Sequence, residues 1–197
     1  MAIMGRPREF CCDKALDLAL QVFWRKGYEG ASMADLTEAM GITKPSLYAA
    51  FGNKEELFRK ALDRYVDGPG GYFQEALTKP TAREVVSHVL YQAADALTNP
   101  AHPPGCLAVQ GALSCGDAAE TIKQELMARR AKGESDLRQR FARALAEGDL
   151  PAGADAADLA RYISAMLQGM AVQAAGGADH AQLRRIADMT LRSWPPV

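Results

Sequence analysis

Hydrophobic residues recur at helical spacing along most of the chain. In the first segment Leu16, Ala19, Leu20 and Phe23 follow the three- and four-residue steps of one helical face. The alternating β-branched runs and Asn-Gly turns that indicate strands do not occur in the sequence. The pattern therefore predicts an all-α protein of about nine helices.

Capping residues and glycines set the expected limits of these helices. Five residues stand three positions before an acidic or amide side chain, the spacing of a capping box: Ser32, Asn53, Thr81, Asp117 and Asp179. The stretch DGPGG at 67–71 should break or bend the chain. We expect helices at about 10–26, 33–40, 44–50, 54–66, 82–97, 106–113, 118–147, 156–175 and 180–193, with helical pattern also over 72–77.

The expected helices fall into two groups. Residues 1–66 hold three short helices and a fourth that could belong to both groups. Residues 67–197 hold longer and more apolar helices. We therefore expect an N-terminal domain at 1–66 and a larger helical body at 67–197.

The helix expected at 44–50 is too short to be stable alone. A rotation of about 100° per residue places Leu47, Ala50 and Phe51 on one side, where they can pack on the preceding helix. The opposite side carries Pro45 and Ala49. A helix, a glycine turn and a short exposed helix form a helix-turn-helix, whose second helix lies in the major groove of DNA.

The exposed side of this short helix suits a DNA groove. Thr43, Lys44 and Ser46 offer hydrogen bonds, and the small Ala49 lets the backbone approach the bases. Tyr48 can direct its hydroxyl to a phosphate or stack on a base edge. The segment 43–49 is therefore a candidate recognition element.

Helix starts in the same region add candidate contacts. Pro45 is tolerated because it falls in a first helical turn, and either Thr43 or Lys44 could be the N-cap residue before it. Free N–H groups at the starts of the second and fourth helices, where Ser32 and Lys54 lie, could bind phosphates. Lys54 would add a positive charge there.

Residues 15–58 resemble the N-terminal domain of the TetR/AcrR-type transcriptional repressors. The resemblance rests on an aromatic-Gly-Tyr turn at 23–28, a Ser-capped second helix, a glycine turn, LYAAF at 47–51 and KEEL at 54–57. It implies an all-helical, homodimeric DNA-binding repressor released by a small-molecule inducer. It also implies base contacts from Thr43, Lys44, Pro45 and Ser46, and phosphate contacts from Ser32, Tyr48 and Lys54.

Two further features leave alternatives open. The stretch GRPR at 5–8 could be an arm whose Arg6 and Arg8 enter the minor groove, or an ordinary solvated tail. Tyr28 could contact the DNA backbone, or it could pack below the turn after the first helix.

The last two expected helices are candidates for a dimer interface. The helix at 156–175 is apolar almost all round, and the helix at 180–193 has one apolar face. They could form a four-helix bundle with a second copy, or only the core of a monomer. A dimer would require a pseudo-palindromic operator. The residues expected at the interface are Tyr162, Ala165, Met166, Gly169, Met170, Leu183, Ile186, Thr190 and Trp194.

Aromatic, Met and Gln side chains of the body are candidates for the inducer site that the resemblance implies. Each could equally be plain core, which is the commoner use of such residues. Gln110 stands out because it lies in an apolar stretch, where a buried amide needs a partner, either a ligand or a neighbouring carbonyl. The candidates are Tyr72, Phe73, Tyr91, Gln110, Leu113, Met127 and Met166.

Cys106 and Cys115 flank that apolar stretch. They could sense thiol-reactive compounds or bind a soft metal together with His102 or His88. They could also pack as small hydrophobic side chains. The cysteine spacing matches no zinc template, so we expect no metal site and no cofactor.

Composition bounds the remaining alternatives. Hydrophobic residues are 48% of the 197, enough for a sizeable core, and the formal net charge of -1 gives no overall indication of nucleic-acid binding. Neither a signal-peptide pattern nor an apolar run of membrane-spanning length is found in the sequence, so we expect a cytoplasmic protein with no membrane partner. No catalytic set is evident, so we expect no enzyme. The alternative function is a helical small-molecule or metal carrier or sensor that does not bind DNA.

Overall fold

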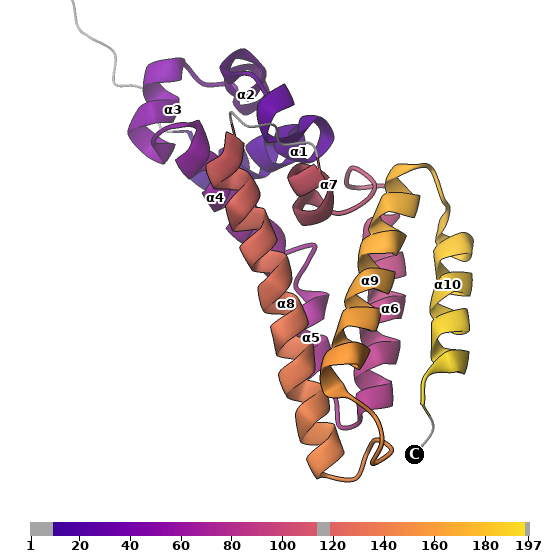
Figure 1. Ribbon diagram of the computed structural model, residues 1–197. Coiled ribbons are helices and arrows are strands. Elements are labelled where there is room, and N and C mark those ends of the chain that lie inside the picture. Colours follow the sequence, from indigo (N-terminus) through magenta and orange to yellow (C-terminus); the bar gives the residue numbers. More distant parts are fainter. Residues whose placement is uncertain (1–9, 114–118, 196–197) are drawn as a thin grey trace, which may run out of the picture.

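The computed structural model describes residues 10–113 and 119–195, without the side chains of Ala112 and Leu113. These ranges contain ten helices and no strand (Figure 1), which confirms the predicted all-α fold. Within them, every helix falls short of the combination of length and hydrophobicity that a membrane span requires. The helices are α1 (Cys12–Gly30), α2 (Met33–Met40), α3 (Lys44–Phe51), α4 (Lys54–Asp67), α5 (Tyr72–Leu77), α6 (Ala82–Leu97), α7 (Leu107–Leu113), α8 (Glu120–Ala146), α9 (Ala156–Ala175) and α10 (His180–Ser193).

Most helix limits follow the predicted caps. Four predicted capping boxes form, with the cap side chain accepting from the backbone three residues later, at Ser32, Asn53, Thr81 and Asp179. The predicted cap Asp117 lies outside the described residues, and α8 begins after Ala119 without a side-chain cap. Local sequence therefore determined most of the helix starts.

The first helix runs further than predicted. Its expected end near residue 26 is a kink at Gly27, which has φ 69° and ψ 178°, and a last short turn continues to Gly30. Positive φ is the region that glycine adopts without steric cost, so this position suits the sequence. The kink directs Tyr28 back toward the core of the N-terminal helices.

Helices α1–α4, which we call the head, close around an aromatic core. The rings of Phe23 and Phe58 meet edge to face with 5.0 Å between centroids, and those of Trp24 and Tyr65 do so at 4.8 Å. The same core includes buried side chains from later helices, namely Leu107, Ile122 and Leu126. The long α8 thus reaches from the body into the head (Figure 1).

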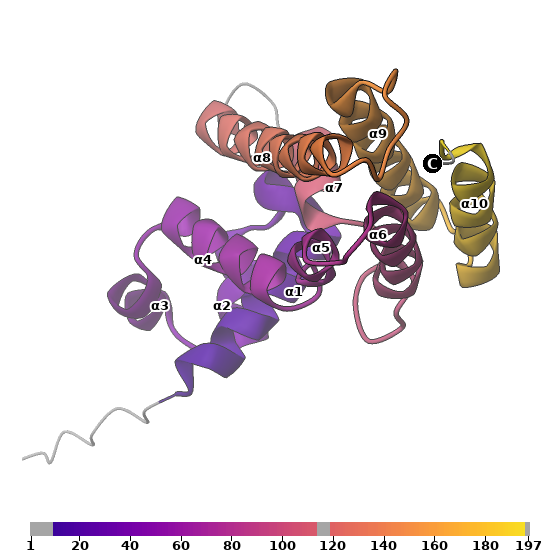
Figure 2. The same ribbon diagram turned by 90° about the horizontal axis from the view of Figure 1, so that it is seen from below.

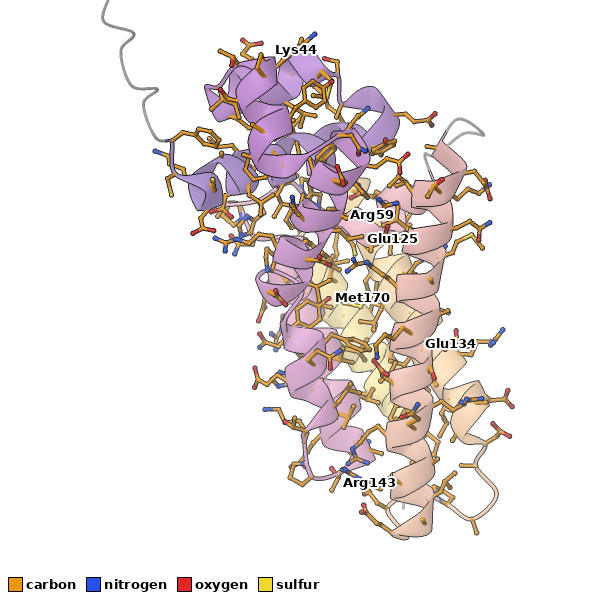
Figure 3. The ribbon with its side chains drawn as sticks, turned by 90° about the vertical axis from the view of Figure 1, so that its left-hand side faces the viewer. Lys44, Arg59, Glu125, Glu134, Arg143 and Met170 are labelled. Atoms are coloured by element: carbon orange, nitrogen blue, oxygen red, sulfur yellow. The ribbon has the colours of Figure 1, made fainter. Side chains whose placement is uncertain are left out.

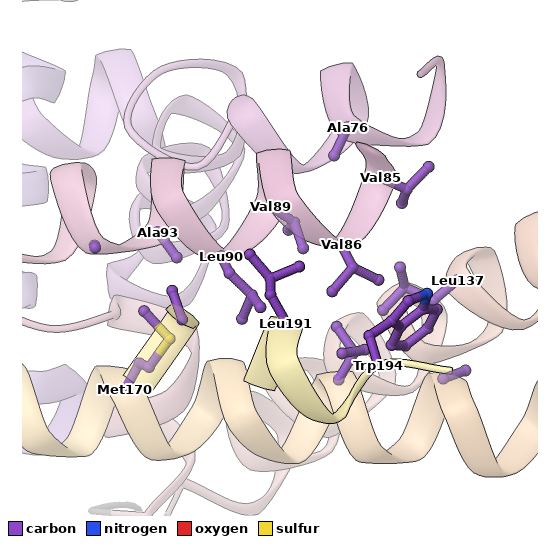
Figure 4. Close-up of a cluster of buried hydrophobic side chains, with 14 of the residues drawn as sticks. Ala76, Val85, Val86, Val89, Leu90, Ala93, Leu137, Met170, Leu191 and Trp194 are labelled. Atoms are coloured by element: carbon purple, nitrogen blue, oxygen red, sulfur yellow. The ribbon is translucent and has the colours of Figure 1, made fainter. Parts of the chain in front are cut away.

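Helices α5–α10, which we call the body, form a bundle with α6 at its centre. Val86, Val89 and Leu90 of α6 are fully buried, and Leu191 of α10 and Trp194, the residue after this helix, belong to the same cluster (Figure 4). Helix α10 lies on the outside of the bundle, beyond α6 and α9 (Figure 2). One side of α10 therefore faces the core and the other faces away from the chain.

Candidate nucleic-acid interface and body cavity

Helix α3 has one buried and one exposed side at the end of the head. Leu47 is fully buried and Phe51 is 4% exposed, whereas Tyr48 is 50% exposed. Ala49 is exposed with it. Ala50, which we expected on the buried side, is exposed because α3 contacts the head only along the line of Leu47 and Phe51. Most of the helix surface is therefore available to a partner.

The first turn of α3 shows which residue is its N-cap. Thr43 has extended backbone and its Oγ1 accepts from the N–H of Ser46 at 3.3 Å, so Thr43 is the N-cap residue. The Oγ atoms of Thr43 and Ser46 are also 2.9 Å apart. Lys44 is exposed and forms no hydrogen bond or ion pair with a described residue. It lies at the tip of the head, far from the body (Figure 3).

Ser32 combines exposure with a full set of hydrogen bonds. Its hydroxyl donates to Asp35 Oδ2 at 2.8 Å and accepts from the Asp35 N–H at 3.0 Å. Lys26 Nζ lies 2.6 Å from Asp35 Oδ1. These bonds, with Lys26 first and Ser32 after it, lower the pKa of Asp35 from 3.8 to about 2. The start of α2 is thus a fixed anchor for the helix-turn-helix.

Lys54 sits on an aromatic side chain at the head surface. Its Nζ lies 4.5 Å from the centre of the Tyr28 ring, and burial lowers its pKa while the charge of Glu29 opposes this. Tyr28 also packs against the rings of Phe23 and Phe58. The structure therefore shows Tyr28 packed below the turn, the second of the two alternatives. The Tyr28 ring also contacts the Lys54 ammonium.

The predicted DNA contacts divide into described and undescribed residues. Arg6 and Arg8 lie outside the described residues. Six of the others are exposed, and Ser46 and Lys54 are half-buried. All of them belong to the head, in or beside α2, α3 and α4: Ser32, Thr43, Lys44, Pro45, Ser46, Tyr48, Ala49 and Lys54.

A ladder of ion pairs joins α4 of the head to α8 of the body. Arg59 Nε lies 2.7 Å from Glu125 Oε2 (Figure 3), and Arg129 Nη2 lies 2.6 Å from Asp63 Oδ1. Glu125 also accepts a hydrogen bond from Arg129 at 3.1 Å, so Arg129 takes part in pairs with both Asp63 and Glu125. The hydrogen bond to Glu125 raises the pKa of Arg59. The ladder fixes α4 against α8, which contributes side chains to the cores of both parts.

A second joint connects α1 to the loop before α7. The Trp24 indole N–H donates to the Gly105 carbonyl at 3.2 Å, and the Trp24 ring stacks on His102 at 5.6 Å. The Tyr65 hydroxyl donates to Cys106 Sγ at 3.2 Å. Residues 102–106 are therefore held by the head although they belong to the body in sequence.

A cavity of about 350 Å³ lies beside this joint. Such a volume is at the lower end of the range for small-molecule sites. Tyr65 and Cys106 of the joint form part of its wall, and the polar wall also includes Tyr72, Arg130, Ser164 and Gln168. The apolar wall is formed by Val66, Phe73, Leu97, Ala108, Val109, Leu167 and Ala171.

The predicted ligand residues do not all reach this cavity. Tyr72 and Phe73 line it, whereas the Leu113 side chain lies outside the described part of the chain. A Cβ at Gly105 would lie 2.9 Å from Gln110 Oε1, so the Gln110 amide packs against the loop backbone. The remaining three lie elsewhere.

Tyr91, Met127 and Met166 face other surroundings. The Tyr91 hydroxyl donates to Asp188 Oδ1 at 2.6 Å, between α6 and α10. Met127 is 44% exposed on α8, and Met166 borders a hollow between α9 and α10. Their helical spacing predicted that each lies on the same helix face as apolar neighbours. It did not predict whether that face borders the cavity, another helix or solvent. We therefore leave these three out of the cavity.

Several cavity residues were not predicted from the sequence. Tyr65 looked like an ordinary residue of α4, and Arg130 one of many charges on α8. Ser164 gave a detectable indication, because it is a small polar residue in a helix that is apolar almost all round. Such a residue is a candidate for lining a cavity.

The predicted dimer residues fall into two groups, those at the outer face of α9 and α10 and those buried inside the chain. Ala165 and Gly169 are exposed, and Tyr162, Met166 and Ile186 border the hollow together with Met189, which is 63% exposed. The others are buried within the chain, although Thr190 also borders the hollow: Met170, Leu183, Thr190 and Trp194.

One of the two cysteines that flank the apolar stretch lies in the described part of the chain. Cys106 is half-buried in the joint, and Cys115 lies outside the described residues. His88 lies 3.5 Å from Glu75, and the His102 ring stacks on Trp24. No group of three or more potential metal ligands gathers among residues 10–113 and 119–195.

Comparison with known proteins agrees with this architecture. Residues 15–61 match the family described as bacterial regulatory proteins, tetR family, and residues 82–190 match the tetracyclin repressor-like C-terminal domain. The HTH-type transcriptional repressor ComR of Escherichia coli is 36% identical over 195 residues, covering 98% of this chain and 93% of ComR.

A solved structure extends the likeness to three dimensions. A cysteine mutant of the TetR family transcriptional regulator CifR, complexed with 26-bp operator DNA, is 43% identical, with a TM-score of 0.91 over 96% of this chain and 100% of CifR. The uncharacterized regulator YezE of Bacillus subtilis is 28% identical over 95% of this chain and 98% of its own. The chain belongs to the TetR family of bacterial transcriptional regulators.

Proposed function

We propose that this protein is a ligand-responsive transcriptional repressor that binds a pseudo-palindromic DNA operator as a homodimer. The two-sided α3 carries the proposal: Leu47 and Phe51 hold it in the head, while Lys44 and Tyr48 stay exposed. The operator complex of CifR supports DNA as the partner. The proposal includes a cytoplasmic location, where a bacterial chromosome is accessible.

The head would read the operator mainly through the first turn of α3. Lys44 and the Thr43–Ser46 hydroxyl pair would face the bases with Pro45, while Ala49 permits close backbone approach. Phosphates would be held by Ser32, Tyr48 and Lys54, and Arg6 and Arg8 would enter the minor groove. Residues 1–66 would form this DNA-binding domain, and residues 67–197 the domain for ligand binding and dimerisation.

The exposed face of α9 and α10 would form the homodimer. Tyr162, Met166, Ile186 and Met189 border a hollow there, and large apolar side chains exposed together indicate a protein contact. A two-fold axis through this face would set the two α3 helices about one DNA turn apart, roughly 34–36 Å.

The cavity beside the joint would receive the inducer. Arg129 lines the cavity and also bonds Asp63 of α4, so a ligand that shifts α8 would shift the head. Occupancy would in this way change the spacing of the two recognition helices and release the operator.

The test is DNA binding by the full chain and by Lys44→Ala combined with Tyr48→Ala. Fluorescence anisotropy with labelled DNA from upstream of the gene should show tight binding at low salt that weakens steeply as salt rises. The double variant should lose at least about tenfold in affinity, since each lost contact costs about 1–3 kcal/mol.

The matched control is Arg138→Ala with Gln139→Ala, two exposed positions on α8 of the body. It should bind DNA like the unaltered chain. If the unaltered protein ignores its upstream DNA at low salt, the repressor proposal fails and a helical small-molecule carrier becomes the better description.

A further inference from the structure

The charged side chains around the body cavity are unevenly paired. Five charged residues line it: Arg129, Arg130, Lys132, Glu134 and Asp136. Four have partners, since Lys132 lies 2.9 Å from Asp136, Glu134 lies 2.7 Å from Arg161, and Arg129 bonds Asp63. Arg130 has no ion pair or hydrogen bond with any residue that the structure describes. The cavity therefore carries one uncompensated positive charge.

One N–H group of the half-buried Arg130 lacks an acceptor in the described part of the chain. Its Nε is removed from solvent and has no acceptor among the described residues. An N–H donor buried without an acceptor is unfavourable for a fold, and more so when it belongs to a charged group. An acceptor that arrives with a ligand would remove that cost, and a negatively charged acceptor would do so best.

Two hydroxyl groups reach the same cavity from other helices. Ser164 of α9 is only 7% exposed, and its side chain has no hydrogen bond within the described ranges. The Tyr72 hydroxyl of α5 likewise has no partner there. Burial raises the pKa of Tyr72 above its ordinary 10, so the hydroxyl keeps its proton and can donate. Three donors from three helices thus border one space.

Another part of the wall is apolar. Phe73, Leu97, Val109 and Leu167 offer a surface to which only a hydrocarbon or aromatic group is complementary. A small inorganic anion would leave this surface uncovered, and a cationic ligand would meet Arg130. The donors and the wall together describe an amphipathic anion.

We propose that the body cavity binds a small amphipathic carboxylate, with its carboxylate on Arg130, Ser164 and Tyr72 and its apolar part against Phe73 and Leu167. This inference rests on the proposed function, since it names the chemical class of the inducer. Guanidinium and carboxylate can form two parallel hydrogen bonds, which fixes the orientation of the ligand. Aliphatic and aromatic acids share this chemistry, so the experiment includes one of each.

The experiment uses the full-length protein without DNA. Octanoate and phenylacetate are compared with octanamide, phenylacetamide and octylamine by thermal unfolding and by isothermal titration calorimetry. At about ten times its dissociation constant, at least one carboxylate should raise Tm by about 3–6 °C. The amides and the amine should give no comparable shift at the same concentration. The carboxylate that binds identifies the aliphatic or aromatic source.

Variants locate the effect. Arg130→Gln should weaken carboxylate binding by about tenfold to a hundredfold, the range for hydrogen bonds to a charged group. Arg138→Gln, an exposed arginine two turns further along α8, should leave it unchanged. If Arg130→Gln fails to fold by circular dichroism, Ser164→Ala takes its place, with an expected loss of about tenfold.

Three results would overturn the inference: no stabilisation by either carboxylate, equal binding of amides and carboxylates, or full carboxylate affinity in the folded Arg130 or Ser164 variant. These results are independent of operator binding. A chain that binds its operator but no carboxylate contradicts only this inference, and a chain that binds carboxylate but no DNA contradicts only the proposed function.

Discussion

The head and the body treat their buried polar groups differently. In the head, throughout residues 12–67, every buried polar side-chain atom has a hydrogen-bond partner. The helix starts there are closed by Ser32 with Asp35, Thr43 with Ser46, and Asn53 with Glu56. In the body, Arg130 and Arg140 hold buried nitrogens without a partner in the described chain. A saturated structure resists change, whereas an unsatisfied one has free energy to gain from a ligand.

The two parts also differ in how they end. The head exposes a polar and cationic recognition turn around Lys44, while the body exposes an apolar face around Met189. The exposed Lys44 suits a negatively charged polymer such as DNA. The proposed function assigns a second copy of the chain to the apolar face of the body and a small molecule to its cavity. The ion-pair ladder, which includes the pair of Asp63 and Arg129, connects the head to the body.

The largest expected effect on the difference between head and body comes from creating a cavity in the head core. Phe58 is fully buried and meets the rings of Phe23 and Tyr28 at 5.0 and 5.3 Å. Phe58→Ala should lower the free energy of unfolding by about 3–5 kcal/mol, measured by urea denaturation. The exposed Tyr48→Ala should change it by no more than about 0.5 kcal/mol. Similar losses in both variants would contradict a close-packed head with a free α3 surface.

The second prediction addresses the apolar face of the body. Met189→Glu would place two like charges across the proposed symmetric interface, at a cost of several kcal/mol. We expect the dimer dissociation constant to rise at least about a hundredfold in sedimentation experiments. Gln139→Glu, exposed on α8, should leave the dimer intact. A Met189→Glu protein that stays dimeric would place the interface elsewhere.

The third prediction tests the ladder between the two parts. Glu125→Gln removes the carboxylate shared by Arg59 and Arg129. Because Arg59 is more than a third exposed, the loss of unfolding free energy should be about 1 kcal/mol at most, and smaller in high salt. Glu147→Gln, whose pair with Arg143 lies within one helix end, should have almost no effect. Equal effects in both variants would show that the ladder does not join head and body.

The smallest expected effect is on the thermal stability of the protein at low pH. The folded-state pKa of Asp35 is about 2, below its usual 3.8, because Lys26 and then Ser32 stabilise the carboxylate. A lowered pKa contributes stability that is present above about pH 4 and is lost as the pH falls toward 2. Asp35→Asn should therefore show a shallower fall of Tm between pH 4 and pH 2. An unchanged slope would mean that the start of α2 does not depend on this charge.

The sequence was most informative where the cause of a structure is local. The caps at Ser32, Asn53, Thr81 and Asp179 lie within three residues of their partners, and the predicted boxes form. It was least informative where a residue's role depends on a distant helix. Tyr72 and Tyr91 have equal standing in the sequence, yet one lines the cavity and the other bonds Asp188.

By itself, then, the sequence determined the all-α fold, most helix limits, and a short α3 with Leu47 inside and Lys44 outside. Periodicity reports which residues share a face of their own helix, and capping chemistry reports where that helix starts. Only the tertiary structure decided what each face meets: the body core for Trp194, the ladder for Arg129, and an unpaired place on the cavity wall for Arg130. The rotation and packing of helices depend on contacts between residues far apart in the chain, which the pattern of one helix does not contain.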